Sequence, residues 1–188
     1  MEAGFQNSSG NRERLPPGRS KACPFMTVKP TSAAARLCAA CGMCCNGVLF
    51  HSVLLQPGDS ARALSALGLK IKRKTFFLQP CPAHQGGRCA IYEQRPNRCR
   101  NFHCRQLLRV TAGETTEASA LQKIARARHL ADRVNALIAR VADPNPNRAI
   151  AQRCANALTT TDRTPLHDEL ESAARDLESL LEKEFRVK

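Results

Sequence analysis

The sequence lacks tryptophan and contains one tyrosine and seven phenylalanines in 188 residues. So few aromatic side chains argue against a sheet whose core is filled by aromatic residues. Alanine supplies much of the apolar content instead, which favours helices that pack through small side chains. We therefore predict a mainly α protein in which something besides apolar packing stabilises the less helical part.

Long apolar runs are also missing. No window approaches the roughly 20 apolar residues of a transmembrane helix. The first 30 residues are polar, are broken by Pro16, Pro17, Pro24 and Pro30, and lack the apolar stretch of a signal peptide. We therefore expect a cytoplasmic protein that does not bind membranes. In the reducing cytosol, clustered cysteines are metal ligands more often than disulfides.

Motifs of the common enzyme classes are absent as well. The sequence contains no Ser-His-Asp order, no phosphate-binding glycine loop and no dinucleotide-binding glycine pattern. Acidic residues are scarce near the cysteines, which argues against a pair of hydrolytic carboxylates. The sequence leaves open whether the protein is an enzyme.

Composition divides the chain into three parts. We predict a flexible N-terminal arm at residues 1–35, a cysteine-cluster metal-binding domain at 36–110 and a helical C-terminal region at 114–188. The predicted fold is mainly α, with a small irregular metal-stapled domain that contains short strands, followed by C-terminal helices. These helices could fold back on the cysteine region or pair with another chain, and the pattern does not choose between the two.

Periodicity and turn formers predict the individual elements. Helices are expected at 60–69, from 116 to just before Pro144, at 148–158 and from Thr164 onward. Strands are expected at 75–78 and 89–92, paired as a hairpin across Gly86-Gly87. Cys154 falls within the third predicted helical segment, where we expect a small buried side chain and not a ligand.

Ten cysteines are present, and eight of them fall into two blocks. The first block is Cys38, Cys41, Cys44 and Cys45, and the second is Cys81, Cys89, Cys99 and Cys104. Two-residue gaps let successive thiolates converge on one ion, because a tight turn, to which Gly42 is suited, brings both sulfurs to one side. This density of cysteines without an export signal predicts that the region binds metal.

The same spacing bears on the type of metal. Eight thiolates suit two Cys₄ zinc sites, whereas four suit one iron-sulfur cluster such as 4Fe-4S. Cys38, Cys41 and Cys44 have the gaps of bacterial ferredoxins, and the remote Cys81 is followed by proline, which slightly favours iron and sulfur. Adjacent cysteines rarely serve one ion, so either Cys44 or Cys45 is expected to reach a second metal or to stay a free thiol. Further candidates for nitrogen ligands are His51, His84 and His103.

The cysteines lie in two longer motifs, of which the first reads CxxCGxCC at 38–45 and the second reads CxIYExRPxxCRxFxC at 89–104. Both motifs resemble those of the YkgJ-type cysteine-cluster family, which is described as zinc- or iron-chelating. The similarity covers about residues 37–106 and implies metal-ligand roles for the eight cysteines of the two blocks, but no activity. The same cysteine module is found in enzymes that methylate flagellin lysines, so the resemblance admits an enzymatic context.

Positive charge predominates. Lys and Arg outnumber Asp and Glu by 29 to 16, and the formal net charge is +13. A basic face around Lys70, Lys72, Arg73 and Lys74 could contact phosphate, but no nucleic-acid-binding motif accompanies it. Arginines of the second motif could instead donate hydrogen bonds to metal-bound sulfur. Three functions therefore compete: a metal-binding module, an iron-sulfur enzyme of redox or methyl-transfer type, and a zinc-stabilised adaptor for nucleic acid or protein.

Overall fold

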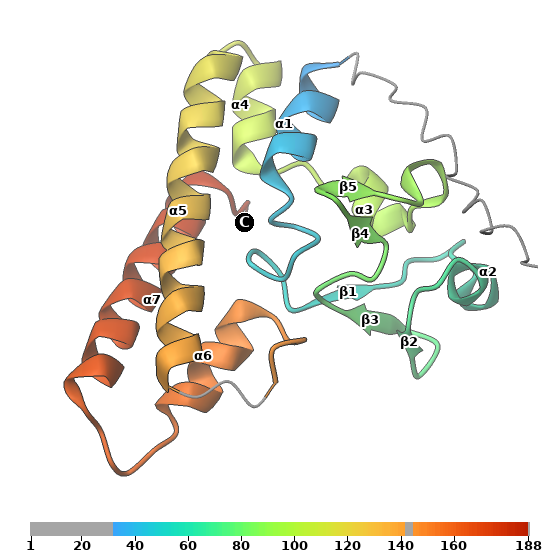
Figure 1. Ribbon diagram of the computed structural model, residues 1–188. Coiled ribbons are helices and arrows are strands. Elements are labelled where there is room, and N and C mark those ends of the chain that lie inside the picture. The colour runs from blue at the N-terminus through green and yellow to red at the C-terminus, as the bar shows by residue number, and fades with distance from the viewer. Residues whose placement is uncertain (1–31, 142–144, 188) are drawn as a thin grey trace, which may run out of the picture.

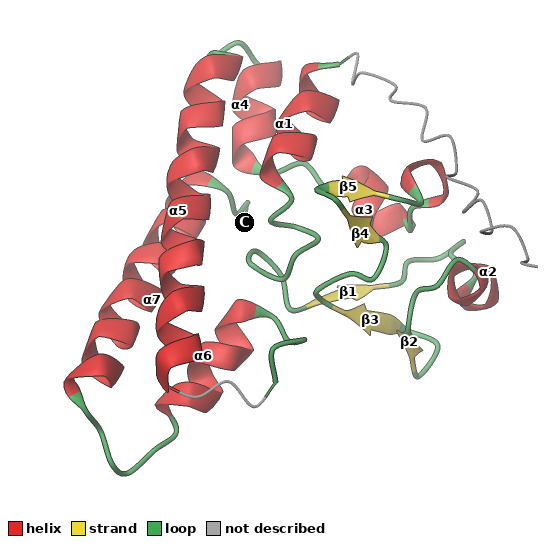
Figure 2. Ribbon diagram, in the orientation of Figure 1, coloured by secondary structure: helices red, strands yellow, loops and turns green. Residues whose placement is uncertain are grey.

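The computed structural model describes residues 32–141 and 145–187 (Figure 1). Short antiparallel strands lie in the middle of the chain and long helices follow at its C-terminal end (Figure 2), which confirms the predicted fold class. The predicted N-terminal arm lies almost entirely outside the described residues, and the first helix begins at Ala33. No helix in the described ranges is long and apolar enough to span a bilayer.

Figure 1 labels the helices and strands in chain order. The helices are α1 (Ala33–Cys41), α2 (Ala61–Ala66), α3 (Asn97–Asn101), α4 (Arg105–Thr111), α5 (Glu117–Val141), α6 (Ile150–Leu158) and α7 (Pro165–Glu184), with one 3-10 turn, η1, at Tyr92–Gln94. The strands are β1 (Ser52–Leu54), β2 (Ile71–Lys72), β3 (Phe76–Leu78), β4 (His84–Gln85) and β5 (Arg88–Cys89). The last three helices confirm those predicted from apolar periodicity.

A large core lies between the helices. Helix α5 packs against α7 and α6, and α1 packs against α5, so the C-terminal helices fold back on the cysteine segment (Figure 1). Ile124 and Val134 of α5 and Leu170 and Leu177 of α7 are buried there, at the spacing of amphipathic helices. Leu121 of α5 has the same apolar spacing but is 36% exposed.

A smaller core lies beside the strands. Its buried members are Val53, Leu69, Phe77, Ala83 and Ile91. Strand β3 is central in the sheet β1-β3-β2, where Val53 of β1 lies opposite Phe77. Because five side chains form this core, apolar burial alone stabilises the sheet part far less than the helical part.

The predicted hairpin was wrong in its partners. The strand at 76–78 pairs with β1 and β2, while the turn at Gly86-Gly87 joins β4 to β5. Strand β1 has three residues, too few to show the alternation that identifies a strand in a sequence. The helix predicted at 60–69 is confirmed but shorter: Ser60 caps it by accepting a hydrogen bond from the Ala63 N–H (3.2 Å), and α2 ends at Ala66.

Candidate metal centre

Helix α1 carries the first two cysteines. Cys38 and Cys41 lie three residues apart near its C-terminal end, so their side chains share one face of the helix. The helix stops at Gly42, whose φ of 66° suits glycine and whose N–H donates to the Cys38 carbonyl (3.0 Å). A helical turn, and not the tight turn predicted, therefore brings these two sulfurs together. The turn that Gly42 permits comes next and leads to Cys44 and Cys45.

Two hydrogen bonds join the second block of cysteines to the first. The Cys81 N–H donates to the Cys45 carbonyl (2.8 Å), and the buried Gln79 side chain donates through Nε2 to the Cys44 carbonyl (3.0 Å). The remaining members of the second block are Cys89 at the end of β5, Cys99 in α3 and Cys104 directly before α4. One backbone bond and one side-chain bond, the latter spanning 35 residues, thus hold the two segments side by side.

The eight thiols fall into two sets. The first thiol set is Cys38, Cys41, Cys44 and Cys104, and the second thiol set is Cys45, Cys81, Cys89 and Cys99. Within each set, every thiol lies close enough to every other for their charges to interact. The two sets adjoin where Cys45 interacts with Cys44 and Cys38.

This partition was not visible in the spacing. The ferredoxin-like reading joined Cys81 to the CxxCxxC run, whereas the structure places Cys104 there and Cys81 with Cys45. Cys44 and Cys45, although adjacent in sequence, lie in different sets. Cys154 is buried in α6, away from both sets, and Cys23 lies outside the described residues.

Burial disfavours the charged form of these thiols. It is the main cause that raises the pKa of Cys41, Cys45 and Cys99 to about 12, and neighbouring cysteines raise the pKa further. Burial also raises the pKa of Cys38, Cys44 and Cys81. Four thiolates in one set therefore require a cation to offset their charge. A metal ion would provide this positive charge and deprotonate the thiols that coordinate the metal.

Groups that favour the thiolate lie beside both sets. The Met43 N–H hydrogen bonds to the Cys41 thiol, and the N–H groups of Ala83 and His84 hydrogen bond to the Cys81 thiol. These bonds oppose the effect of burial on the pKa, because an amide N–H stabilises a negative sulfur. They would also orient both sulfurs toward a bound metal.

Two arginines bring positive charge to the thiols. The charge of Arg95 opposes the effect of burial on the pKa of Cys38 and Cys99. Arg128, which donates to the Ala40 carbonyl (2.8 Å), does the same for Cys41. The Arg95 guanidinium lies over the Tyr92 ring at 3.6 Å from its centroid, and Nε donates to the Tyr92 carbonyl (2.7 Å). Tyr92 and Arg95 of the second motif thus hold one cation near both sets.

As the side chains stand, no group of three or more His, Cys, Asp or Glu residues within 32–141 and 145–187 could hold a metal ion. The two thiol sets are compatible with this, because charges interact over longer distances than coordination bonds allow. Zinc-sulfur bonds of about 2.3 Å require sulfurs about 3.8 Å apart. Rotation of the cysteine side chains would have to close each set around a metal.

The donor atoms fit such a metal. No disulfide uses any of the nine cysteines that the structure describes, so all eight thiols of the sets are available. The Nε2 atom of His84 is buried, has no hydrogen-bond partner among the described residues, and lies 3.1 Å from where a Cβ on Gly42 would be. Of the three candidate histidines, His84 is thus the one placed beside the turn between Cys41 and Cys44.

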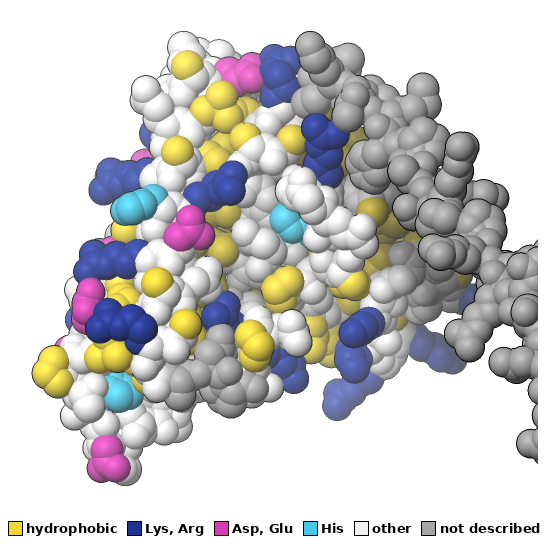
Figure 3. All heavy atoms as spheres, in the orientation of Figure 1, with side chains coloured by type: hydrophobic (Ala, Val, Ile, Leu, Met, Phe, Trp, Pro, Cys, Tyr) yellow, Lys and Arg dark blue, Asp and Glu magenta, His cyan; other side chains and the backbone are white. Residues whose placement is uncertain are grey.

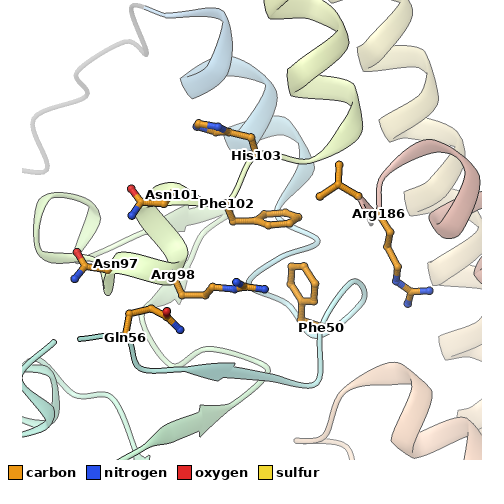
Figure 4. A pocket seen from close by; sticks show the side chains of 9 residues that line it. Phe50, Gln56, Asn97, Arg98, Asn101, Phe102, His103 and Arg186 are labelled. Carbon is orange, nitrogen blue, oxygen red and sulfur yellow. The ribbon is translucent and has the colours of Figure 1, made fainter. Parts of the chain in front are cut away.

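A groove of about 490 Å³ opens beside α3 (Figure 4). It is lined by Phe50, Gln56, Asn97, Arg98, Asn101, Phe102, His103, Arg186 and Val187. Arg98 extends from α3 toward the rings of Phe50 and Phe102, which meet edge to face with centroids 4.9 Å apart. None of these lining residues is Cys, Asp or Glu, so the groove offers neither a thiol nor the carboxylate pair of a hydrolase.

Residues 37–125 match one family model, CxxCxxCC, which bears the description "Putative zinc- or iron-chelating domain". Residues 37–125 are thus similar to the CxxCxxCC family of domains. The match spans both thiol sets and confirms the family resemblance of the two cysteine motifs. It supports metal binding, by zinc or iron, as the property of the CxxCxxCC domain. Comparisons with curated proteins and with solved structures gave no match.

Proposed function

We propose that the CxxCxxCC domain binds two metal centres, one in each thiol set. The observation that carries this proposal is the division of eight thiols into two sets of four, each drawn from both cysteine blocks. Four thiolates are the complete ligand set of a structural zinc site and also of a 4Fe-4S cluster. Zinc in both sets would make the domain a metal-stabilised structural module.

One feature supports iron-sulfur clusters and a redox role in particular. The fourth cysteine of a bacterial ferredoxin run ligates the other cluster of the pair. Cys45, the fourth cysteine of the run that starts at Cys38, likewise lies in the other thiol set. Two adjacent clusters would supply electron transfer. In that role the chain itself would hold the sulfurs, limit their contact with water, and offset their charge through Arg95 and Arg128.

The test is metal analysis of protein purified without oxygen. Iron, acid-labile sulfide and zinc are measured per chain, together with the visible absorption spectrum, for the parent protein and three variants. Cys104→Ala removes a ligand of the first thiol set, Cys81→Ala removes one of the second, and Cys154→Ala is the control outside both. We expect each of the first two variants to lose about half of the bound metal and the control to lose none.

The outcomes separate the alternatives. Labile sulfide with broad visible absorbance establishes clusters, whereas colourless protein with two zinc ions per chain establishes structural sites. A single centre that either ligand variant abolishes would contradict the division into two sets. Protein without metal, and with disulfides among these cysteines, would overturn metal binding altogether.

A further inference from the structure

The sheet part of the molecule carries positive charge without negative charge. Residues 60–92 contain six Lys and Arg residues and no Asp or Glu. On the face seen in Figure 3, Lys and Arg side chains gather at the lower right, over the sheet, with no acidic side chain among them. Over α5 and α7, on the left of the same view, both signs alternate.

Four of these cations lie on one hairpin. Lys70, Lys72, Arg73 and Lys74, which we call the basic hairpin, belong to or adjoin the connection between β2 and β3. All four are exposed, and their side chains make no hydrogen bond or ion pair with any residue of the described ranges. Asp59, the acidic residue nearest in sequence, accepts hydrogen bonds from the N–H groups of Gln56 (2.8 Å) and Asn97 (2.9 Å). The hairpin charge is thus free to act on a partner.

Balancing the thiolates does not explain this charge. The cations that act on the thiol sets are Arg95 and Arg128, which lie on other segments. Arg95 precedes α3 and Arg128 lies in α5. The basic hairpin projects from the opposite edge of the sheet from β1, the strand that leads back to the first cysteine block (Figure 1).

The backbone conformation of the turn also indicates that this charge has a function. The Thr75 N–H donates to the Lys72 carbonyl (3.0 Å), and the two residues between them, Arg73 and Lys74, have φ values of 48° and 59°. Turns with two such residues favour Asn-Gly, because longer side chains are strained in the left-handed region. Two long cationic side chains at these positions lower stability relative to Asn-Gly, so their presence indicates a use for their charge.

We propose that the basic hairpin binds the phosphate backbone of duplex nucleic acid. A two-stranded ribbon fits the major groove, which is about 12 Å wide. Its four exposed cations would neutralise phosphates and release counterions. Attraction to an anionic lipid surface depends chiefly on the number of cations, so it would not require them in a strained, closed turn. This inference is independent of which metal the thiol sets bind.

The decisive variant combines Arg73→Asn with Lys74→Gly. It replaces the strained cations by the preferred turn residues, so we expect an unchanged or higher midpoint of urea unfolding together with weaker binding. Binding is measured by fluorescence anisotropy of metal-loaded, full-length protein with a labelled 20-base-pair DNA of arbitrary sequence, in about 50 to 200 mM salt. Affinity at the lowest salt should fall at least about 10-fold, and the slope of log K against log salt should shrink by about 2.

A matched control removes equal charge elsewhere. Arg126→Gln with Arg175→Gln takes two exposed cations from α5 and α7 and should leave the affinity within about twofold. If the turn variant is less stable than the parent protein, Lys70→Gln with Lys72→Gln tests the same charge without altering the turn. The proposal is overturned if the parent protein does not bind the duplex, or if the control loses as much affinity as the hairpin variants.

Two further probes test the kind of partner. Leu54 at the end of β1 and Leu67 directly after α2 are 60% and 40% exposed and could assist contact with lipid. Vesicles with 30% anionic lipid and a labelled single strand of 20 nucleotides are therefore titrated alongside the duplex. Tighter binding to the duplex than to either probe supports the proposal. Preference for the vesicles or for the single strand contradicts it.

Discussion

The cysteine-rich part of the molecule and its helical part differ in both charge and core. Residues 32–113 contain twelve Lys and Arg against two Asp and Glu, whereas residues 114–188 contain twelve of each. The main core draws chiefly on the helices and has twenty buried members, while the core beside the strands has five. The helical part can therefore be stabilised by apolar burial and paired charges, and the cysteine-rich part requires another source of stability.

Metal bound at the thiol sets could supply this additional stability, because both sets lie against a core. Cys81, Cys89 and Cys99 of the second set pack against the small core. Cys41, Cys44 and Cys104 of the first set pack against the large core, where α1 and α4 meet α5. Metal in the second set would thus stabilise the sheet part, and metal in the first set would fasten that part to the helices.

Removal of the metal should have the largest effect on the relative stability of the two parts. Metal binding by thiolates in small domains is worth about 10–16 kcal/mol, at least as much as burial of the five core side chains supplies. We expect a chelator to abolish hydrogen-exchange protection in β1, β3 and α3 while α5 and α7 keep theirs. Hydrogen exchange followed by mass spectrometry, with and without the chelator, checks this. Equal loss of protection in both parts would show that the helical core does not stand without the metal.

Alkaline pH should destabilise the metal-free cysteine-rich part relative to the helical part, by less than removal of the metal does. Burial raises the pKa of Cys41, Cys45 and Cys99 to about 12 from an ordinary value of 9.0, so folding holds these thiols protonated. Their effect on metal-free stability is therefore constant below pH 9 and becomes unfavourable as the pH rises from 9 toward 12. At pH 10 the cost is about 1 kcal/mol per thiol.

The matched measurement uses metal-loaded protein, whose bound sulfurs are already thiolates. Urea unfolding at pH 7.5, 9 and 10 should show a falling midpoint without metal and a nearly constant midpoint with metal. The same decline in both forms would mean that the thiols are not ligands. The helical part should contribute little to this difference, because its one described cysteine, Cys154, lies outside both thiol sets.

Sequence patterns predicted the two parts unequally, for physical reasons. The stripe that includes Ile124 and Val134 repeats within one helix, so periodicity revealed both the element and its buried face. The thiol sets depend on long-range contacts, such as that from Gln79 to the Cys44 carbonyl and the return of the chain at Cys104. Spacing along the chain singled out the eight cysteines as candidate ligands but could not assign Cys81 and Cys104 to their sets.

The smallest predicted effect concerns the end of α7, within the helical part. Glu184 accepts hydrogen bonds from Lys123 (2.8 Å), Gln106 (3.0 Å) and Arg109 (3.0 Å), which link α7 to α5 and α4. The hydrogen bond from Lys123 is the main cause that lowers the pKa of Glu184 below its ordinary 4.5. This contribution to stability is therefore present above pH 4.5 and is lost as the pH falls below it.

Glu184→Gln should destabilise the protein by about 1–2 kcal/mol at pH 7, because Lys123, Gln106 and Arg109 all lose a charged acceptor. Asp176→Asn is the control, because Asp176 is an exposed carboxylate of the same helix that makes no hydrogen bond or ion pair within the described residues. Thermal unfolding is followed by the helical signal in both metal-loaded and metal-free protein. If the two parts are stabilised independently, the loss of stability is equal in the metal-loaded and metal-free forms. A loss confined to the metal-loaded form would show that the stability of α7 depends on metal in the first thiol set, through α4.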